Sequence, residues 1–183
     1  RMNYVGELGF EIFHPIQHQI TLYHDLMNAG ADAGIRLIGM HAMDSMRLEK
    51  GYLAWKSEMN VHHTPLETNV AWTVKMDKEF NGKKGIEKQK AEGIAQKLVC
   101  MVVDATDSDP FGYNPIFAGE ERIGMTSSGG YGHRVEKSIA LGYVKPEYAK
   151  AGTKLDVEIL GRKRSAEVVT MPLYDPKNEK MKS

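Results

Sequence analysis

The feature that most constrains the fold is a series of short strand-like segments after about residue 94. Turn-forming residues separate them, among them Gly119, Gly152 and Gly161. Regularly spaced short strands with such turns are typical of a small antiparallel sandwich or barrel. We therefore expect a small antiparallel sandwich or barrel of six strands over residues 94–176. The expected strands are 97–103, 114–117, 121–125, 138–143, 154–159 and 165–169.

The first 93 residues differ, because helical and strand-like patterns alternate there. Apolar residues at helical spacing predict helices over 17–31 and 40–50, and a short basic helix over 82–89. Short strands are expected between them, at 10–13, 35–38 and 70–76, with a loop over 52–65. Because these strands are short and half polar, they predict an antiparallel sheet with helices on one face. The fold class is thus α+β followed by all-β.

Composition excludes several classes of function. Lys plus Arg and Asp plus Glu both number 24 in the 183 residues, so no bulk charge attracts nucleic acid or an anionic membrane. No apolar run approaches the ~18 residues of a membrane span. The single cysteine, Cys100, excludes an internal disulfide and lies in an apolar run, so we expect a buried, inert thiol and a reducing compartment.

The two ends carry weaker signals. The chain starts at Arg1 without a signal or transit pattern and runs directly into strand-like sequence, which suggests entry in mid-domain. The polar, Lys-rich residues 177–183 are expected to form a flexible tail.

Local motifs for chemistry are weak. His62 and His63 are adjacent and have no third ligand at metal-site spacing, so no metal site is expected. Residues 127–133 contain the glycines of a phosphate cradle but lack the following Lys, and a turn is the better interpretation. No nucleophile elbow and no Gly-x-Gly-x-x-Gly fingerprint occur, so no catalytic residue and no flavin site is predicted.

Two further patterns have a structural and a functional interpretation. On a strand, Glu11 and Phe13 share a face, and a carboxylate beside an aromatic ring matches a heterocycle edge with paired N–H donors. From the residues alone, a Glu11 that faces water on an edge strand is the better interpretation. In the helix 40–50, Asp44 and Arg47 can pair, and methionines 40, 43 and 46 form an apolar stripe, which favours a structural helix.

Taken together, these segments resemble the aminomethyltransferase fold family, the T-protein of the glycine cleavage system and its relatives. Residues 4–11, Tyr-Val-Gly-Glu-Leu-Gly-Phe-Glu, are similar to one family motif, and residues 42–51, Ala-Met-Asp-Ser-Met-Arg-Leu-Glu-Lys-Gly, to the next. Further matching segments follow in the family's order and extend the resemblance to Pro176. They are 64–67, Trp72, 80–83, 124–127 and 139–142.

The resemblance implies a function and a set of binding residues. Residues 47–60 look most similar to the dimethylglycine and sarcosine dehydrogenase branch, in which a flavin domain oxidises an N-methylamine and this region captures the one-carbon unit on tetrahydrofolate. By this resemblance Glu11 binds the pterin edge, and the folate rings are surrounded by Tyr4, Ile12, Phe13 and Trp72. The fold implied is a partial ferredoxin-like layer over residues 1–93, followed by the six-stranded barrel.

Two departures limit this interpretation. T-proteins carry Arg where this chain has Met43, which favours the dehydrogenase branch. The family's catalytic Asp lies upstream of the first motif and has no counterpart here, and neither does the FAD domain. We therefore expect weak or absent folate affinity for this chain alone, because part of a pocket cannot desolvate the ring.

Alternatives remain open. The chain could be a fragment of a stand-alone folate-dependent aminomethyl or methyl transferase or demethylase, or a non-catalytic relative of the same fold. The resemblance implies a bacterial cytoplasmic or mitochondrial matrix location. An exposed apolar sheet edge in the first 93 residues would permit a homodimer.

Overall fold

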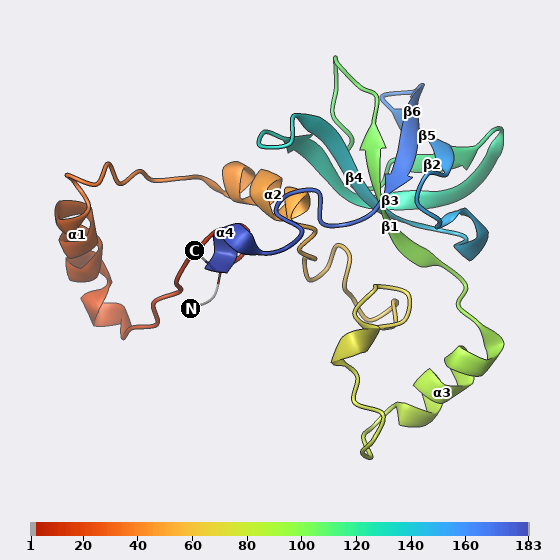
Figure 1. The fold of residues 1–183 in the computed structure, drawn as a ribbon, viewed down its shortest axis with the longest axis horizontal. Coiled ribbons are helices and arrows are strands. Elements are labelled where there is room, and N and C mark those ends of the chain that lie inside the picture. Colours follow the sequence, from red (N-terminus) through yellow and green to blue (C-terminus); the bar gives the residue numbers. More distant parts are fainter. Residues whose placement is uncertain (1–2, 183) are drawn as a thin grey trace.

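The computed structural model describes residues 3–182, and its second half is a closed antiparallel barrel (Figure 1). The strands pair around the barrel in the order β1-β4-β3-β2-β5-β6, and every pairing is antiparallel. This confirms the six-stranded barrel. The strands are β1 (Lys97–Val103), β2 (Pro115–Ala118), β3 (Glu121–Gly132), β4 (Lys137–Val144), β5 (Lys154–Ile159) and β6 (Arg162–Val169).

The barrel core follows from alternation along the strands. In β5, Leu155, Val157 and Ile159 are buried, whereas the intervening side chains are not. Strands β1 and β4 are buried on both faces, because α2 (Met40–Glu49) packs against their outer side through Leu48. Cys100 lies in this outer cluster and is buried, as predicted.

The turn predicted for the serine- and glycine-rich segment was wrong. Residues 127–132 continue strand β3, which pairs with β4 as far as Gly132. Glycine serves close packing here, because a Cβ built on Gly129 would lie 2.6 Å from the carbonyl oxygen of Pro110. A phosphate cradle is thereby excluded, since these residues form a strand and not a loop.

The predicted helices of the first 93 residues are present: α1 (Gln19–Ala29), α2, and α3 (Lys83–Glu92). The strands predicted at 10–13, 35–38 and 70–76 were wrong. Residues 10–13 and 35–38 belong to no helix or strand, and Ala71–Thr73 forms a 3-10 helix, η2. A strand needs a partner for its backbone hydrogen bonds, and none of these segments has one among residues 3–182. The remaining short helices are η1 (Ile16–His18), η3 (Pro146–Tyr148) and α4 (Glu179–Lys182).

The segment that carries α1 extends away from the barrel as an arm (Figure 1). None of the residues of α1 is buried, and the apolar side chains Phe10, Phe13 and Ile20 are 70%, 81% and 74% exposed. The sheet edge through which a dimer was predicted is missing from the described residues, because the barrel is closed and no strand lies outside it.

Helix α2 joins this first part of the chain to the barrel. Its buried residues are Arg47, Leu48 and Glu49. The predicted methionine stripe was wrong, since Met40 is 72% exposed and none of the three methionines is buried. The predicted pairing of Asp44 with Arg47 is confirmed at 2.6 Å. The C-terminal end of α2 is thus the part of the helix that is buried against the barrel.

Candidate functional site

An aromatic cavity of about 500 Å³ lies where the N-terminal turn, the end of α2 and the segment after β6 meet. We call it the aromatic cavity; Tyr4, Tyr52 and Trp72 line it together with apolar groups such as Leu53 and Met171. This volume falls within the range of small-molecule sites. An apolar enclosure with three aromatic rings suits a flat heterocycle.

A tight turn places Tyr4 in the cavity wall. The side-chain oxygen of Asn3 accepts hydrogen bonds from the backbone N–H groups of Val5 and Gly6, at 3.3 and 2.9 Å. Gly6 has φ of 74°, and a Cβ there would lie 2.8 Å from Cδ of Lys50. Only glycine therefore allows the turn to approach Lys50 this closely. The result is a Tyr4 hydroxyl that donates to the carbonyl oxygen of Leu53 at 2.9 Å.

Two tyrosine rings form one side of the cavity. The rings of Tyr4 and Tyr52 are stacked, with centroids 6.0 Å apart and planes 14° from parallel. Burial is the main cause that raises the pKa of each hydroxyl, so both remain neutral at physiological pH. Trp72, on η2, is 78% exposed and forms an open edge of the cavity.

The segment after β6 covers Lys50 and Tyr52. The buried Lys50 ammonium donates to the carbonyl oxygen of Asp175 at 2.6 Å and to its carboxylate at 3.0 Å. The Tyr52 hydroxyl donates to the sulfur of Met181 at 3.0 Å, so the predicted tail includes α4 in contact with the site. The C-terminal segment thus forms part of the cavity's support.

A buried ion pair anchors the loop between α2 and η2. Glu58 is fully buried; one carboxylate oxygen accepts from Arg47 at 3.1 Å and from the Ala54 N–H at 2.8 Å. The other accepts from the hydroxyls of Ser127 and Ser128 on β3. Each carboxylate oxygen of Glu58 thus accepts two hydrogen bonds, and such bonds compensate a buried charge for the water it has lost. The loop that carries Leu53 and Met59 into the cavity wall is therefore tied directly to the barrel.

A second ion-pair network ties the other side of α2 to the barrel. The Glu49 carboxylate, also fully buried, accepts from the guanidinium and the backbone N–H of Arg134, each at 2.5 Å. Arg134 also donates to Glu7 at 2.6 Å, and its guanidinium lies 3.8 Å from the ring centroid of Tyr174. Of the charged residues in the motif 42–51, Lys50 lines the aromatic cavity, whereas Arg47 and Glu49 hold the surrounding segments in place.

The structure brings together only part of the predicted binding set. Tyr4 and Trp72 line the aromatic cavity. Glu11, Ile12 and Phe13 are exposed in the segment that precedes η1 and do not line it. Sequence reasoning missed Tyr52; its only signal was an aromatic residue directly after the helix-ending Gly51.

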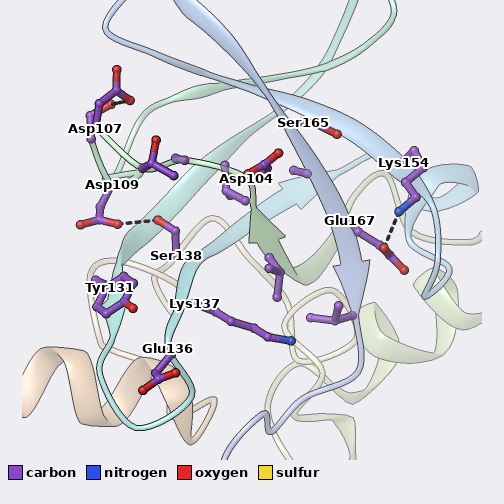
Figure 2. A pocket seen from close by; sticks show the side chains of 17 residues that line it. Asp104, Asp107, Asp109, Tyr131, Glu136, Lys137, Ser138, Lys154, Ser165 and Glu167 are labelled. Carbon is purple, nitrogen blue, oxygen red and sulfur yellow. Dashed lines mark hydrogen bonds and ion pairs between the residues drawn. The ribbon is translucent and has the colours of Figure 1, made fainter.

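A larger cavity, of about 1070 Å³, lies elsewhere, along the β1, β4 and β6 strands. Figure 2 shows its carboxylates spread around the rim, where Asp109 accepts from Ser138 and Glu167 pairs with Lys154. None of the predicted site residues lines it. Within residues 3–182, no group of three or more His, Cys, Asp or Glu side chains is arranged to hold a metal ion.

The chain thus has the architecture of a two-part protein: a helical first part is joined by buried ion pairs to a closed antiparallel barrel at the C-terminal end. Family models agree with both parts: the GCVT N-terminal domain matches residues 1–78, and the glycine cleavage T-protein C-terminal barrel domain matches residues 96–175. The chain belongs to the glycine cleavage T-protein family.

Curated relatives carry two kinds of name. Dimethylglycine dehydrogenase, mitochondrial, of Rattus norvegicus is 38% identical over 175 residues, which are 94% of this chain and 20% of that protein. Aminomethyltransferase of Halothermothrix orenii is 35% identical over 173 residues, 94% of this chain and 48% of that protein. The chain thus spans about a fifth of the first relative and about half of the second.

A solved structure shares the fold. The crystal structure of glycine cleavage system aminomethyltransferase T from Bartonella henselae matches 94% of this chain and 48% of its own, with a TM-score of 0.87 and 29% identity. Among the described residues, no helix has the length and apolar character needed to cross a membrane.

Proposed function

We propose that this chain is the tetrahydrofolate-binding C-terminal portion of a flavin-dependent N-methylamine dehydrogenase that acts on dimethylglycine, sarcosine or a similar amine. In this role it captures the released one-carbon unit as methylene-tetrahydrofolate. The aromatic cavity carries the proposal, because it joins Tyr4 of the first family motif to Tyr52 and Trp72. The similarity to dimethylglycine dehydrogenase over 94% of the chain favours this branch.

The residues of the cavity fit a reduced folate. Its ring system is flat and aromatic in part, and such rings stack on tyrosine and tryptophan faces. The stacked pair Tyr4 and Tyr52 and the open face of Trp72 offer these surfaces. Bound tetrahydrofolate would supply the nucleophilic nitrogen that accepts the one-carbon unit. The chain's own contribution is to bind the faces of the ring.

Glu11, the carboxylate proposed for the pterin edge, lies outside the cavity. In our proposal the segment 7–15 packs against another part of a longer protein and brings Glu11 to the ligand. The exposure of Phe10 and Phe13 supports this, because large apolar side chains on one short segment are rarely left in water without a partner. FAD would be held outside this chain.

Nuclear magnetic resonance tests the proposal with 5-formyltetrahydrofolate, a stable reduced folate. We expect the Trp72 indole N–H signal to shift in a saturable way, with a dissociation constant weaker than about 1 mM because the cavity is open. Tyr52→Ala should abolish the shift. Trp55, which is 64% exposed and does not line the cavity, serves as the internal control. Equal shifts at both tryptophans, or a Trp72 shift that persists in Tyr52→Ala, would count against the proposal.

A second candidate is a portion of a stand-alone folate-dependent aminomethyltransferase. It is favoured by the solved aminomethyltransferase of TM-score 0.87, whose matched region is about half of that chain. Met43, at the position where T-proteins carry Arg, argues for the dehydrogenase branch. Coding sequence upstream decides between the two: a flavin-binding fingerprint supports the dehydrogenase, and a bare folate domain supports the transferase.

A further inference from the structure

A second cavity, of about 440 Å³, lies beside the aromatic cavity and plays no part in the folate proposal. The loop between α2 and η2 borders both, through Leu53 and Met59 on the aromatic cavity and through Lys56 and His63 here. We call it the His63 cavity. Its opposite wall is formed by the first half of β3 and the end of β4, including Tyr143.

The lining of the His63 cavity is cationic and contains no carboxylate. Lys56, Arg122 and Lys145 line it, and no Asp or Glu does. Lys145 pairs with Glu121, outside the lining. Among residues 3–182, no carboxylate lies within ion-pair distance of Lys56 or Arg122. In the part of the chain that the structure describes, the guanidinium of Arg122 makes one side-chain hydrogen bond, at 3.5 Å, to the sulfur of Met125. Two positive charges therefore face one cavity without a counter-ion from the described chain.

The ring of His63 forms part of the cavity wall. It stacks on the ring of Tyr143, with centroids 3.8 Å apart and planes 5° from parallel. Its Nδ1 is buried and has no hydrogen-bond partner among the described residues. Burial lowers the pKa of His63, against the opposing effect of Glu67, so the ring is neutral at pH 7 and carries one donor and one acceptor. A buried polar atom without a partner is rare in a folded protein and calls for an explanation.

The walls of this cavity are fixed by the same contacts that anchor the loop. The Tyr143 hydroxyl donates to the carbonyl oxygen of Glu58 at 2.6 Å, and Ser127 of the lining donates to the Glu58 carboxylate at 2.7 Å. Gly124 lets β3 approach β4 closely, since a Cβ there would lie 2.0 Å from the carbonyl oxygen of Tyr143. The cavity is thus a built feature of the fold, lined by rigid strands on one side.

We propose that the His63 cavity binds a small organic anion, whose carboxylate or phosphate group pairs with Lys56 and Arg122 and whose body lies beside the His63–Tyr143 stack. Arginine presents a planar fork that matches an oxyanion, and lysine a point charge. The volume of the cavity, about 440 Å³, lies within the range of small-molecule sites. The inference does not depend on folate binding in the aromatic cavity.

The test titrates the full 183-residue chain with sodium phosphate and, separately, with p-aminobenzoylglutamate, while the His63 ring signals are followed by magnetic resonance. His63→Asn assigns those signals, and sodium chloride at equal ionic strength is the salt control. We expect saturable shifts at His63 with at least one probe. The double variant Lys56→Gln/Arg122→Gln should weaken binding by about tenfold or more, because charge-assisted hydrogen bonds are lost.

A matched variant separates a specific site from a general charge effect. Lys84→Gln/Lys88→Gln, on the exposed face of α3, removes the same charge away from the cavity and should leave the affinity unchanged. Tighter binding of p-aminobenzoylglutamate would identify the carboxylate end of a folate as the ligand, and tighter binding of phosphate a phosphorylated metabolite; both support an oxyanion site. Shifts that sodium chloride reproduces, or equal losses in the two double variants, would overturn it.

Discussion

Removal of the Glu58 carboxylate should destabilise the protein more than any change to an exposed carboxylate. Glu58 has 0% exposure and accepts hydrogen bonds from Arg47, the Ala54 N–H and two serine hydroxyls of β3. In Glu58→Ala, Arg47, itself 2% exposed, keeps only Asp44 as a charged partner. The Asp44 side chain is 51% exposed, so it compensates poorly.

The magnitude follows from the cost of an unpaired buried charge. Loss of one partner from a buried ion pair costs about 3–5 kcal/mol, so Glu58→Ala should lower the free energy of unfolding by that amount. Glu58→Gln keeps the shape and can still accept from the N–H donors, so we expect a smaller loss of about 1–3 kcal/mol. The exposed pair Glu79–Lys83 provides the control: Glu79→Ala removes a carboxylate that is 90% exposed and should cost less than about 0.5 kcal/mol.

Urea unfolding followed by far-ultraviolet circular dichroism measures these differences through linear extrapolation. The expected order of destabilisation is Glu58→Ala, then Glu58→Gln, then Glu79→Ala. In a double-mutant cycle, Arg47→Met combined with Glu58→Ala should cost less than the sum of the single changes, because neither charge is then left alone. A Glu58→Ala protein within about 1 kcal/mol of the wild type would refute the argument that this pair anchors the loop.

Three further outcomes are expected. Gly6→Ala should destabilise more than Gly152→Ala: both positions have positive φ, which costs about 1–2 kcal/mol for alanine, but only the Cβ at Gly6 would meet Lys50, at 2.8 Å. Urea unfolding compares the two variants, and equal losses would contradict the packing argument. Burial raises the pKa of the Cys100 thiol to about 12, so a disulfide reagent at pH 8 should modify it only after unfolding; rapid reaction of the native protein would contradict this. Burial alone would raise the pKa of Asp175, but hydrogen bonds from Lys50 and two α4 N–H groups outweigh it and hold that pKa below its ordinary value. The stability that Asp175 contributes is then present above about pH 4 and is lost as the pH falls through the lowered pKa. As the pH falls through this lowered pKa, the difference in unfolding free energy between wild type and Asp175→Asn should shrink. A difference that stays constant would refute the contribution of the ionised Asp175 to stability.

Local sequence pattern was sufficient for the strands of the barrel, and the family resemblance favoured a barrel over a sandwich. Strand β5, between Gly152 and Gly161, buries alternate side chains, so its pattern could be read without knowledge of the partner strands. The pattern misled at residues 127–132, where glycine permits close backbone packing against Pro110 and not a turn. It also misled at residues 35–38 and 70–76, because strand formation depends on a partner that the local pattern does not contain.

The candidate site could also be predicted only in part from the sequence. The resemblance to a known family predicted Tyr4 and Trp72 as binding residues, and both line one cavity in the structure. The distant partners of the charged residues at the end of α2 were beyond sequence reasoning. Arg47 meets Glu58, Glu49 meets Arg134 and Lys50 meets Asp175, and the last two pairs lie 85 and 125 positions apart.

The sequence by itself therefore determined the six barrel strands, the helices and the family, because periodicity, turn residues and ordered motifs are local properties of the chain. Only the tertiary structure decided which charges are buried, which rings form a cavity and which nitrogen of His63 has no partner. Those properties depend on side chains that the fold brings together from distant positions. Burial then makes each of them matter, because a charge or polar atom removed from water must find its partner within the protein.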